Sequence, residues 1–287
     1  MEKVEFGDLK IDDCLSNRQA STIFKLKDGE VFKNFNPMYV DLVKACGVDL
    51  ESRTLKAKPI NNVPEIIVPK RAVYNNGLFL GYTMDEAKGV DFNTYDFNQD
   101  LFEKTNLLRY GLEHLKMEDI IKRGNSEDVV FPDFCTCDNI FIDENGNFSL
   151  IDYDGIQVGN NNVMCISTSL GGEMLHNNAK YKNGELYTTE LDKKSLIHLY
   201  FSTVFNINLS VLDENGVSLD QVFQMIGLDD YDIMEKVWKT TRNDKNNEFL
   251  GEDVLNLANE YKLYARPVPK EKVNGQEGVY QKVLVRK

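Results

Sequence analysis

The sequence predicts an α+β protein, with a mostly antiparallel sheet and one helix in the first third of the chain and a mainly helical remainder. In the first third of the chain, short runs alternate between apolar and polar residues and end at turn residues, which is typical of strands. After residue 89, leucines recur at helical spacing instead. A third observation is a strand hairpin at 139–152, which stands alone within the helical half.

The first predicted hairpin carries a lysine on an apolar face. Residues 21–26 (STIFKL) and 30–35 (EVFKNF) flank an Asp-Gly turn and alternate as paired strands do. Val31, Lys33 and Phe35 fall on one side of the second strand. A lysine that is buried needs a carboxylate or a phosphate as partner, because an unpaired charge is costly to remove from water. Lys33 is therefore a candidate functional residue.

A broken helix and two more strands complete the predicted first third of the chain. Residues 37–55 show helical spacing with a break near Gly47, and 64–74 and 77–84 alternate as strands on either side of an Asn-Asn-Gly turn. In the helical remainder, leucines at 101, 108, 112 and 115 predict a helix that ends before Gly124. Further helices are predicted at 191–205, 219–226, 231–240 and 251–263.

Composition excludes several classes of function. The 287 residues carry a net charge of −13; the six basic and two acidic residues of 266–287 give this tail +4, so residues 1–265 carry −17. A nucleic-acid surface needs clustered lysine and arginine, so we expect no nucleic-acid binding. Five cysteines without a CxxC pair and three histidines indicate neither a disulfide framework nor a zinc site. With no leader-like or membrane-spanning apolar run, we expect a cytoplasmic protein without a membrane partner.

The hairpin at 139–152 has a polar residue at each end. Two short alternating runs flank the Asn-Gly pair at 145–146, which is a strong hairpin signal. Asn139 begins the first run and Asp152 ends the second, and the chain continues as Tyr153-Asp154-Gly155. The basic tail at 266–287 closes in VYQKVLV, which predicts an added strand or a docking arm.

In this order, the motifs resemble the protein kinase fold from about residue 9 to residue 263. Asp152-Tyr153-Asp154 stands where kinases have Asp-Phe-Gly, and Asn139 stands where the catalytic loop supplies its metal-binding asparagine. The resemblance implies that Asn139 and Asp152 hold a Mg²⁺ ion that bridges the phosphates of ATP. It also implies a bilobal α+β fold, with an N-lobe at 1–84, a hinge at 84–88, a C-lobe at 85–265 and the basic tail at 266–287.

The same resemblance assigns roles in nucleotide binding. Val31-Phe32-Lys33 is similar to the strand that offers the phosphate-binding lysine, and Glu51 is similar to the helix glutamate that steadies it. The segment GYTMDEAKG resembles the hinge. It implies that Met84 guards the back pocket and that the backbone of Asp85 and Ala87 binds adenine.

Later matches are structural. Asp192 resembles the aspartate of the long central helix whose carboxylate ties down the backbone of the catalytic loop. Glu173 in SLGGEML resembles the glutamate of Ala-Pro-Glu, with Arg242 as its partner.

The sequence departs from the family pattern in two places. Residues 9–26 contain no glycine, so CLSNRQASTIF replaces the Gly-rich loop, and phosphates have to be approached with side chains present. The catalytic aspartate of the family lies five residues before the asparagine, whereas here that position is Phe134 and Asp133 lies one residue further away. Either a one-residue bulge brings Asp133 to the substrate hydroxyl, or Phe134 fills the site and transfer is inefficient.

Three functions remain open at this stage. The first is an atypical serine/threonine protein kinase-like phosphotransferase that uses ATP and Mg²⁺, with a protein as substrate or partner. The second is a pseudokinase that binds nucleotide and acts as a regulatory or scaffold module. The third is a small-molecule phosphotransferase similar to aminoglycoside and choline kinases, to which Ile151-Asp152-Tyr153-Asp154 also has some likeness.

Overall fold

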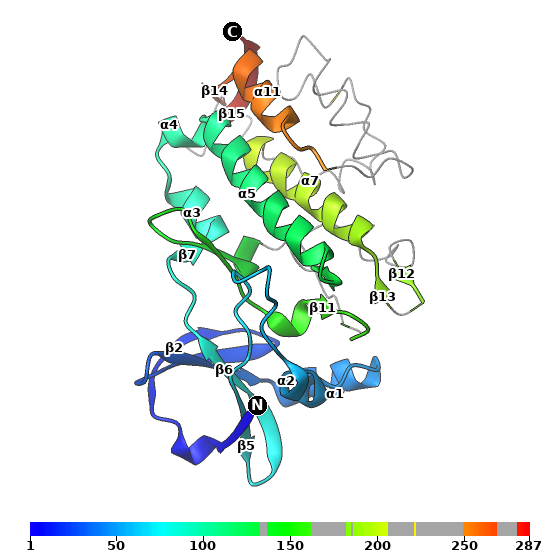
Figure 1. The fold of residues 1–287 in the computed structure, drawn as a ribbon. Helices are drawn as coiled ribbons and strands as arrows, with labels where there is room; N and C mark the ends of the chain where they lie inside the picture. The colour runs from blue at the N-terminus through cyan, green and yellow to red at the C-terminus, as the bar shows by residue number, and fades with distance from the viewer. Residues whose placement is uncertain are drawn as a thin grey trace.

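The chain folds as a mixed α+β protein with a six-stranded sheet at one end and packed helices at the other (Figure 1). The computed structural model describes residues 1–132, 137–161, 163, 182–184, 186–205, 221, 249–268 and 280–287. The predicted α+β class is confirmed.

The sheet occupies the first 85 residues and is antiparallel except at one edge. Its strand order is β1-β5-β6-β4-β3-β2, and only the pair β1–β5 within it is parallel. The predicted hairpin is confirmed, because β3 pairs with β4 over the expected residues, whereas β1 was not predicted. The strands are β1 (Glu2–Glu5), β2 (Ile11–Asn17), β3 (Ser21–Leu26), β4 (Glu30–Phe35), β5 (Arg71–Asn75) and β6 (Leu78–Asp85).

Both faces of β4 are buried. Val31, Lys33 and Phe35 lie on one face as predicted, and Phe32 packs with Leu26 and Val73 on the other. The β5–β6 turn fits its sequence, because Asn76 and Gly77 both adopt the positive φ that a type I′ turn requires (50° and 82°).

Two short helices cover the sheet face that carries Lys33. They are α1 (Pro37–Ala45) and α2 (Leu50–Lys56). The side chain of Asn36 caps α1 and that of Asp49 caps α2. Gly47 separates them at a φ of 81°, so the predicted break is confirmed.

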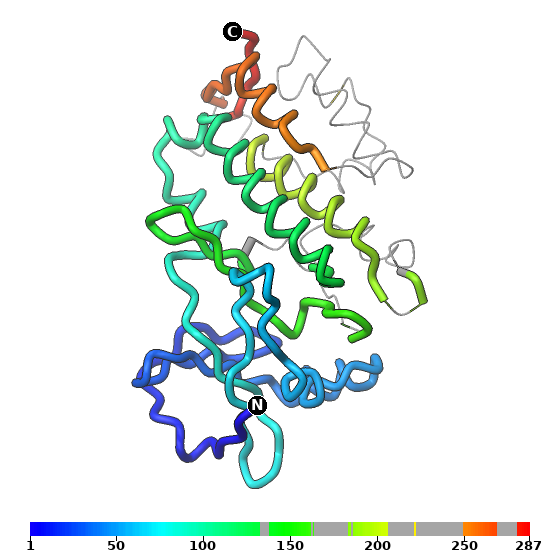
Figure 2. Tube along the Cα trace, viewed as in Figure 1, coloured from blue at the N-terminus to red at the C-terminus, as the bar shows by residue number. Residues whose placement is uncertain are grey.

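The helical end is built around α5, which packs against both α7 and α11 (Figure 2). Its apolar core gathers side chains from these three helices and the last two strands, including Leu107, Ile197, Phe201, Val254 and Leu284. The helices are α3 (Phe92–Asn98), α4 (Leu101–Lys104), α5 (Leu107–Asn125), α7 (Thr189–Phe205) and α11 (Asp253–Glu260). The helices predicted at 219–226 and 231–240 lie outside the described residues, apart from Gln221.

The predicted hairpin at 139–152 is confirmed and lies between the sheet and the helices. Strand β9 (Ile140–Ile142) pairs with β10 (Phe148–Leu150) and with β7 (Val90–Asp91). The turn contains five residues rather than two: the carboxylate of Asp143 accepts hydrogen bonds from the backbone N–H groups of Asn145 and Asn147. Short elements flank the hairpin: β8 (Val129–Val130), η2 (Cys137–Asn139), η3 (Tyr153–Gly155), β11 (Gln157–Val158), β12 (Lys182–Asn183) and β13 (Leu186–Tyr187).

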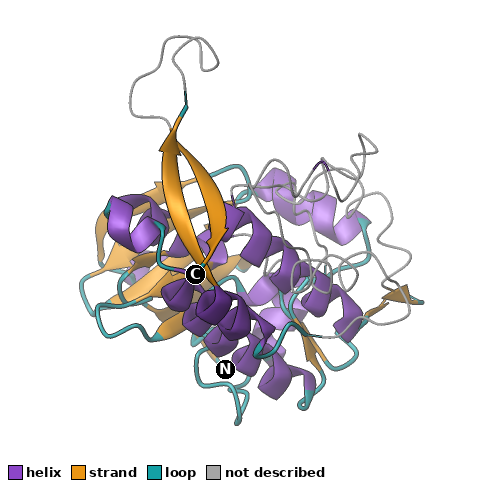
Figure 3. Ribbon diagram, turned by 90° about the horizontal axis from the view of Figure 1, so that it is seen from above, coloured by secondary structure: helices purple, strands orange, loops and turns teal. Residues whose placement is uncertain are grey.

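The described end of the tail forms a strand. Strand β15 (Tyr280–Arg286) pairs with β14 (Tyr261–Pro267), and Figure 3 shows the two as a long ribbon beside the helices. The helix predicted to reach residue 263 was too long, because α11 ends at Glu260 and the YKLYA sequence that follows alternates as a strand. The boundary drawn after residue 265 therefore falls inside β14.

Candidate functional site

Lys33 is buried at the centre of the site. It lies on β4 directly opposite Tyr82 of β6, so the two side chains project from the same face of the sheet. Both side chains are buried. A lysine in this position is stable only with counter-charges close by, because removing an ammonium group from water is costly.

Two carboxylates supply these counter-charges. Lys33 Nζ donates a hydrogen bond of 2.7 Å to Asp154 Oδ1 and forms a second ion pair with Asp152. Tyr82 donates a hydrogen bond of 2.7 Å to the same oxygen of Asp154. Burial acts to lower the pKa of Lys33, but the charges of Asp152 and Asp154 outweigh it and hold this pKa well above its ordinary value. Lys33 is therefore charged at neutral pH.

The two carboxylates differ in exposure. The Asp154 side chain is 5% exposed, whereas that of Asp152 is 28% exposed. Burial acts to raise the pKa of Asp154, but the charge of Lys33 and hydrogen bonds from Lys33 and Tyr82 outweigh it, so this pKa lies below its ordinary value. Asp152 has a left-handed backbone with a φ of 68°, a conformation that aspartate tolerates better than most residues. Of these two carboxylates, Asp152 is the one that a ligand can reach from solvent.

Helix α2 reaches the site through Arg53 and not through Glu51. The Arg53 guanidinium is buried and donates a hydrogen bond of 2.7 Å to the carbonyl oxygen of Ile156 and one of 3.4 Å to that of Tyr153. The expected pair between Lys33 and Glu51 is wrong, because Glu51 accepts a hydrogen bond from Tyr74 instead. Residues two apart on a helix are rotated by about 200°, so Arg53 and Glu51 point in opposite directions.

Asn139 lies beside Asp152. The backbone N–H of Ile151 donates to the carbonyl oxygen of Asn139, which brings the two ends of the hairpin together. Asn139 and Asp152 line one small cavity of about 20 Å³, which is room for a single water-sized species. Within the described ranges, no group of three or more His, Cys, Asp or Glu side chains could hold a metal ion. Mg²⁺ requires less, since one or two protein oxygens and the substrate's phosphates usually complete its coordination.

An ion pair joins the sheet to the hairpin region. Arg18 follows β2, in the tight turn to β3, and donates a hydrogen bond of 2.7 Å to Asp138, which precedes Asn139. Both side chains have access to solvent, and Arg18 is 67% exposed. Arg18 thus lies in the glycine-free segment that was predicted to stand in place of the Gly-rich loop.

Asp192 contacts the backbone that leads to Asp133, as expected. Its carboxylate is buried in α7 and accepts a hydrogen bond of 2.7 Å from the N–H of Phe131. Burial raises the pKa of Asp192 well above its ordinary value, although the Phe131 hydrogen bond opposes this shift. The expectations for Asp133, Phe134, Glu173 and Arg242 concern positions outside the described residues.

The residues expected at the hinge lie at and after the end of β6. Met84 is buried among the apolar residues on the Lys33 face, opposite Val31 of β4. Asp85 is the last residue of β6, and its exposed carboxylate forms an ion pair with Lys70. Ala87 is half-buried in the connection to β7.

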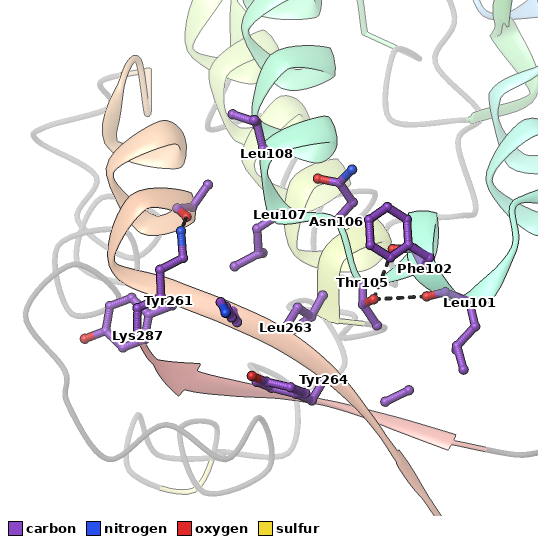
Figure 4. A pocket seen from close by; sticks show the side chains of 13 residues that line it. Leu101, Phe102, Thr105, Asn106, Leu107, Leu108, Tyr261, Leu263, Tyr264 and Lys287 are labelled. Atoms are coloured by element: carbon purple, nitrogen blue, oxygen red, sulfur yellow. Dashed lines mark hydrogen bonds between the residues drawn. The ribbon is translucent and has the colours of Figure 1, made fainter.

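A separate groove lies at the helical end of the molecule. Its volume is about 720 Å³. Figure 4 shows the residues that line it, from α4 and the start of α5 on one side and from α11 and β14 on the other. Its walls are mainly apolar, and the charged residues among its described lining are Lys262 and Lys287. Without a carboxylate in that lining, the groove has no equivalent of the Lys33 and Asp152 arrangement.

No family model and no curated protein matches this chain. In the part of the chain that the structure describes, no helix is both long and apolar enough to cross a bilayer.

Sequence reasoning missed Tyr82, Arg53, Arg18 and Asp154 as members of the site. Asp154 had a local signal, since it lies two residues after Asp152 in the same motif. The others had none, because each meets the site only through contacts between segments that are far apart in the sequence.

Proposed function

We propose that this chain is an atypical kinase-like phosphotransferase that uses ATP and Mg²⁺, with the bilobal protein kinase fold and its ATP site between residues 1–84 and 85–265. The observation that carries the proposal is the ion pair between buried Lys33 and partly exposed Asp152. A charged lysine next to an accessible carboxylate, with an asparagine at the other end of the same hairpin, is the donor set that binds nucleotide phosphates with a metal ion.

Each residue has a task that follows from its contacts. Lys33 Nζ has three N–H donors and uses two on carboxylates, so one is available to a phosphate oxygen. Asn139 and Asp152 would hold Mg²⁺, which when bound neutralises charge on the phosphates. The Arg18 side chain is exposed and can exchange Asp138 for phosphate. Phosphoryl transfer depends chiefly on such positioning and charge neutralisation.

A second candidate is a nucleotide-binding module without transfer. It is favoured by the sequence around Asp133, which lies six residues before Asn139 where the family spacing is five. Asp133→Asn separates the two candidates. In an active kinase it leaves ATP affinity nearly intact and lowers transfer by about 10²–10⁴-fold, as expected for a lost acid–base group.

The experiment is transfer of radiolabelled γ-phosphate from ATP to a generic acceptor protein, to the chain itself, and to choline and aminoglycosides. Transfer by the wild type that is lost in Asp152→Ala supports the phosphotransferase, and the acceptor identifies its class. ATP binding without transfer supports the second candidate. A wild type that does not bind ATP at millimolar concentration refutes both.

A further inference from the structure

We infer that Asp154 is the residue that positions Lys33 for phosphate binding, in the place of a glutamate from helix α2. The inference rests on the proposed function, since it concerns the same lysine. It assigns to the second aspartate of the motif at 152–154 a role that the first aspartate cannot fill.

Asp154 holds the Lys33 side chain in place, and we call it the anchor of Lys33. One oxygen, Oδ1, accepts hydrogen bonds of 2.7 Å from both Lys33 and Tyr82. These two residues lie opposite each other on β4 and β6, so the carboxylate fixes the lysine relative to its neighbour in the sheet. A bond that is charged, buried and shared with a second donor restricts the lysine side chain to one position.

The two carboxylates differ in exposure, and we assign them different roles for that reason. Asp152 is accessible and can turn to another partner when nucleotide binds. Asp154 is enclosed and keeps Lys33 when Asp152 is engaged elsewhere. Lys33 then has two donors for phosphate oxygens while the third remains on Asp154.

Helix α2 supports the anchor through the backbone. Arg53 binds the carbonyl oxygens of Tyr153 and Ile156, the residues on either side of the Asp154–Gly155 turn. Glu51 faces Tyr74 and leaves the position next to Lys33 to Asp154. Helix α2 therefore acts on the turn through Arg53 and does not contact Lys33 through Glu51.

The test compares binding of ATP and of adenosine by calorimetry in Asp154→Asn, Tyr82→Phe and Glu51→Gln. Adenosine lacks the phosphates, so a residue that positions Lys33 affects ATP alone. Asp154→Asn is expected to weaken ATP binding by roughly tenfold or more, as for a lost hydrogen bond to a charged group, and to leave adenosine binding unchanged. Tyr82→Phe is expected to weaken ATP binding less. Glu51→Gln is the matched control and should bind both ligands as the wild type does.

A double-mutant cycle excludes a merely structural role. In a Lys33→Met background, Asp154→Asn should cause no further loss of ATP affinity, because the residue acts through the lysine. Equal losses for ATP and adenosine, additive losses in the cycle, or a large loss in Glu51→Gln would overturn the inference. A wild type that binds neither ligand would refute the proposed function instead. The cycle measured on the free energy of unfolding would then decide whether Lys33 and Asp154 are coupled, with additivity refuting the anchor.

Discussion

Lys33 Nζ and Asp154 Oδ1 lie 2.7 Å apart, and both side chains are buried where strand β4 meets the turn that follows the hairpin. Removing one partner of such a pair leaves an uncompensated charge in the interior, which costs far more than the pair itself contributes. We predict that Lys33→Met lowers the free energy of unfolding by about 3–5 kcal/mol at pH 7, measured by urea denaturation. Lys25→Met is the matched control, because its ion pair with Glu86 is partly exposed and its loss should change the free energy of unfolding far less.

The free energy of unfolding should depend on pH in opposite directions in the wild type and in Lys33→Met. In the wild type the pKa of Asp154 is below its unfolded value of 3.8, so its contribution is present above pH 3.8 and lost as the pH falls through the folded value. The pKa of Lys33 is above 10.5, so its contribution persists through neutral pH. Without Lys33, burial raises the pKa of Asp154, and Lys33→Met should lose stability relative to the wild type as the pH rises from about 4 to 7. Parallel curves for the two proteins would contradict the buried pair.

Arg18 is predicted to contribute to ATP affinity and almost nothing to stability. Its ion pair with Asp138 is exposed, and exposed pairs are worth about 0–1 kcal/mol. We expect Arg18→Gln to weaken binding of ATP severalfold, to leave adenosine binding unchanged and to shift the free energy of unfolding by less than about 1 kcal/mol. Lys27→Gln, an exposed lysine in the turn at the other end of β3, should leave both affinities unchanged. If both variants bind ATP equally well, Arg18 does not contact the phosphates.

Arg53 is predicted to hold the turn that contains Asp154. Arg53→Gln removes charged donors from the carbonyl oxygens of Tyr153 and Ile156 and should cost about 1–3 kcal/mol. Amide hydrogen exchange in 153–158 should rise in this variant, because the turn loses its contact with α2. Glu51→Gln, two residues away on the same helix, should leave exchange in this segment unchanged. A rise in both variants would mean that α2 itself has loosened.

Lys282 is predicted to make stability depend on alkaline pH. It is buried in β15, where it donates hydrogen bonds to the hydroxyl of Tyr110 and, at 2.7 Å, to the carbonyl oxygen of Thr203. Burial lowers its pKa to about 8. The unfolded chain therefore binds more protons between about pH 8 and the ordinary value of 10.5, and this residue makes stability rise with pH in that range. The difference in melting temperature between the wild type and Lys282→Met should change in favour of the wild type from pH 8 to 10; a constant difference would contradict the shifted pKa.

The sequence predicted best what depends on neighbours along the chain. The β3–β4 hairpin, the break at Gly47 and the hairpin from Asn139 to Asp152 follow from alternation and turn residues, and the structure confirms all three. The side of a helix that meets a distant segment is harder to infer. Glu51 and Arg53 fit the helical pattern equally well, and only packing against the turn at 153–155 decides which of them contacts the site.

Pairing between distant segments explains the other differences. Strand β1 joins the sheet by parallel pairing with β5, about 70 residues further along, and its short sequence carries no local signal for this. The sequence of residues 261–263 is compatible with the end of a helix. In the structure these residues form a strand because they pair with β15. The anchor at Asp154 likewise depends on a lysine 121 residues away.

The most direct test of the central claim is calorimetric titration of ATP, with and without Mg²⁺, into the wild type, Asp152→Asn and Glu144→Gln. Glu144 is an exposed acid in the same hairpin and serves as the control. We predict that Mg²⁺ strengthens ATP binding to the wild type and to Glu144→Gln, and that this increase disappears in Asp152→Asn while binding without Mg²⁺ persists. An ATP affinity that responds to Mg²⁺ equally in all three proteins, or no ATP binding by the wild type, would contradict the assignment of Lys33 and Asp152 as the nucleotide site.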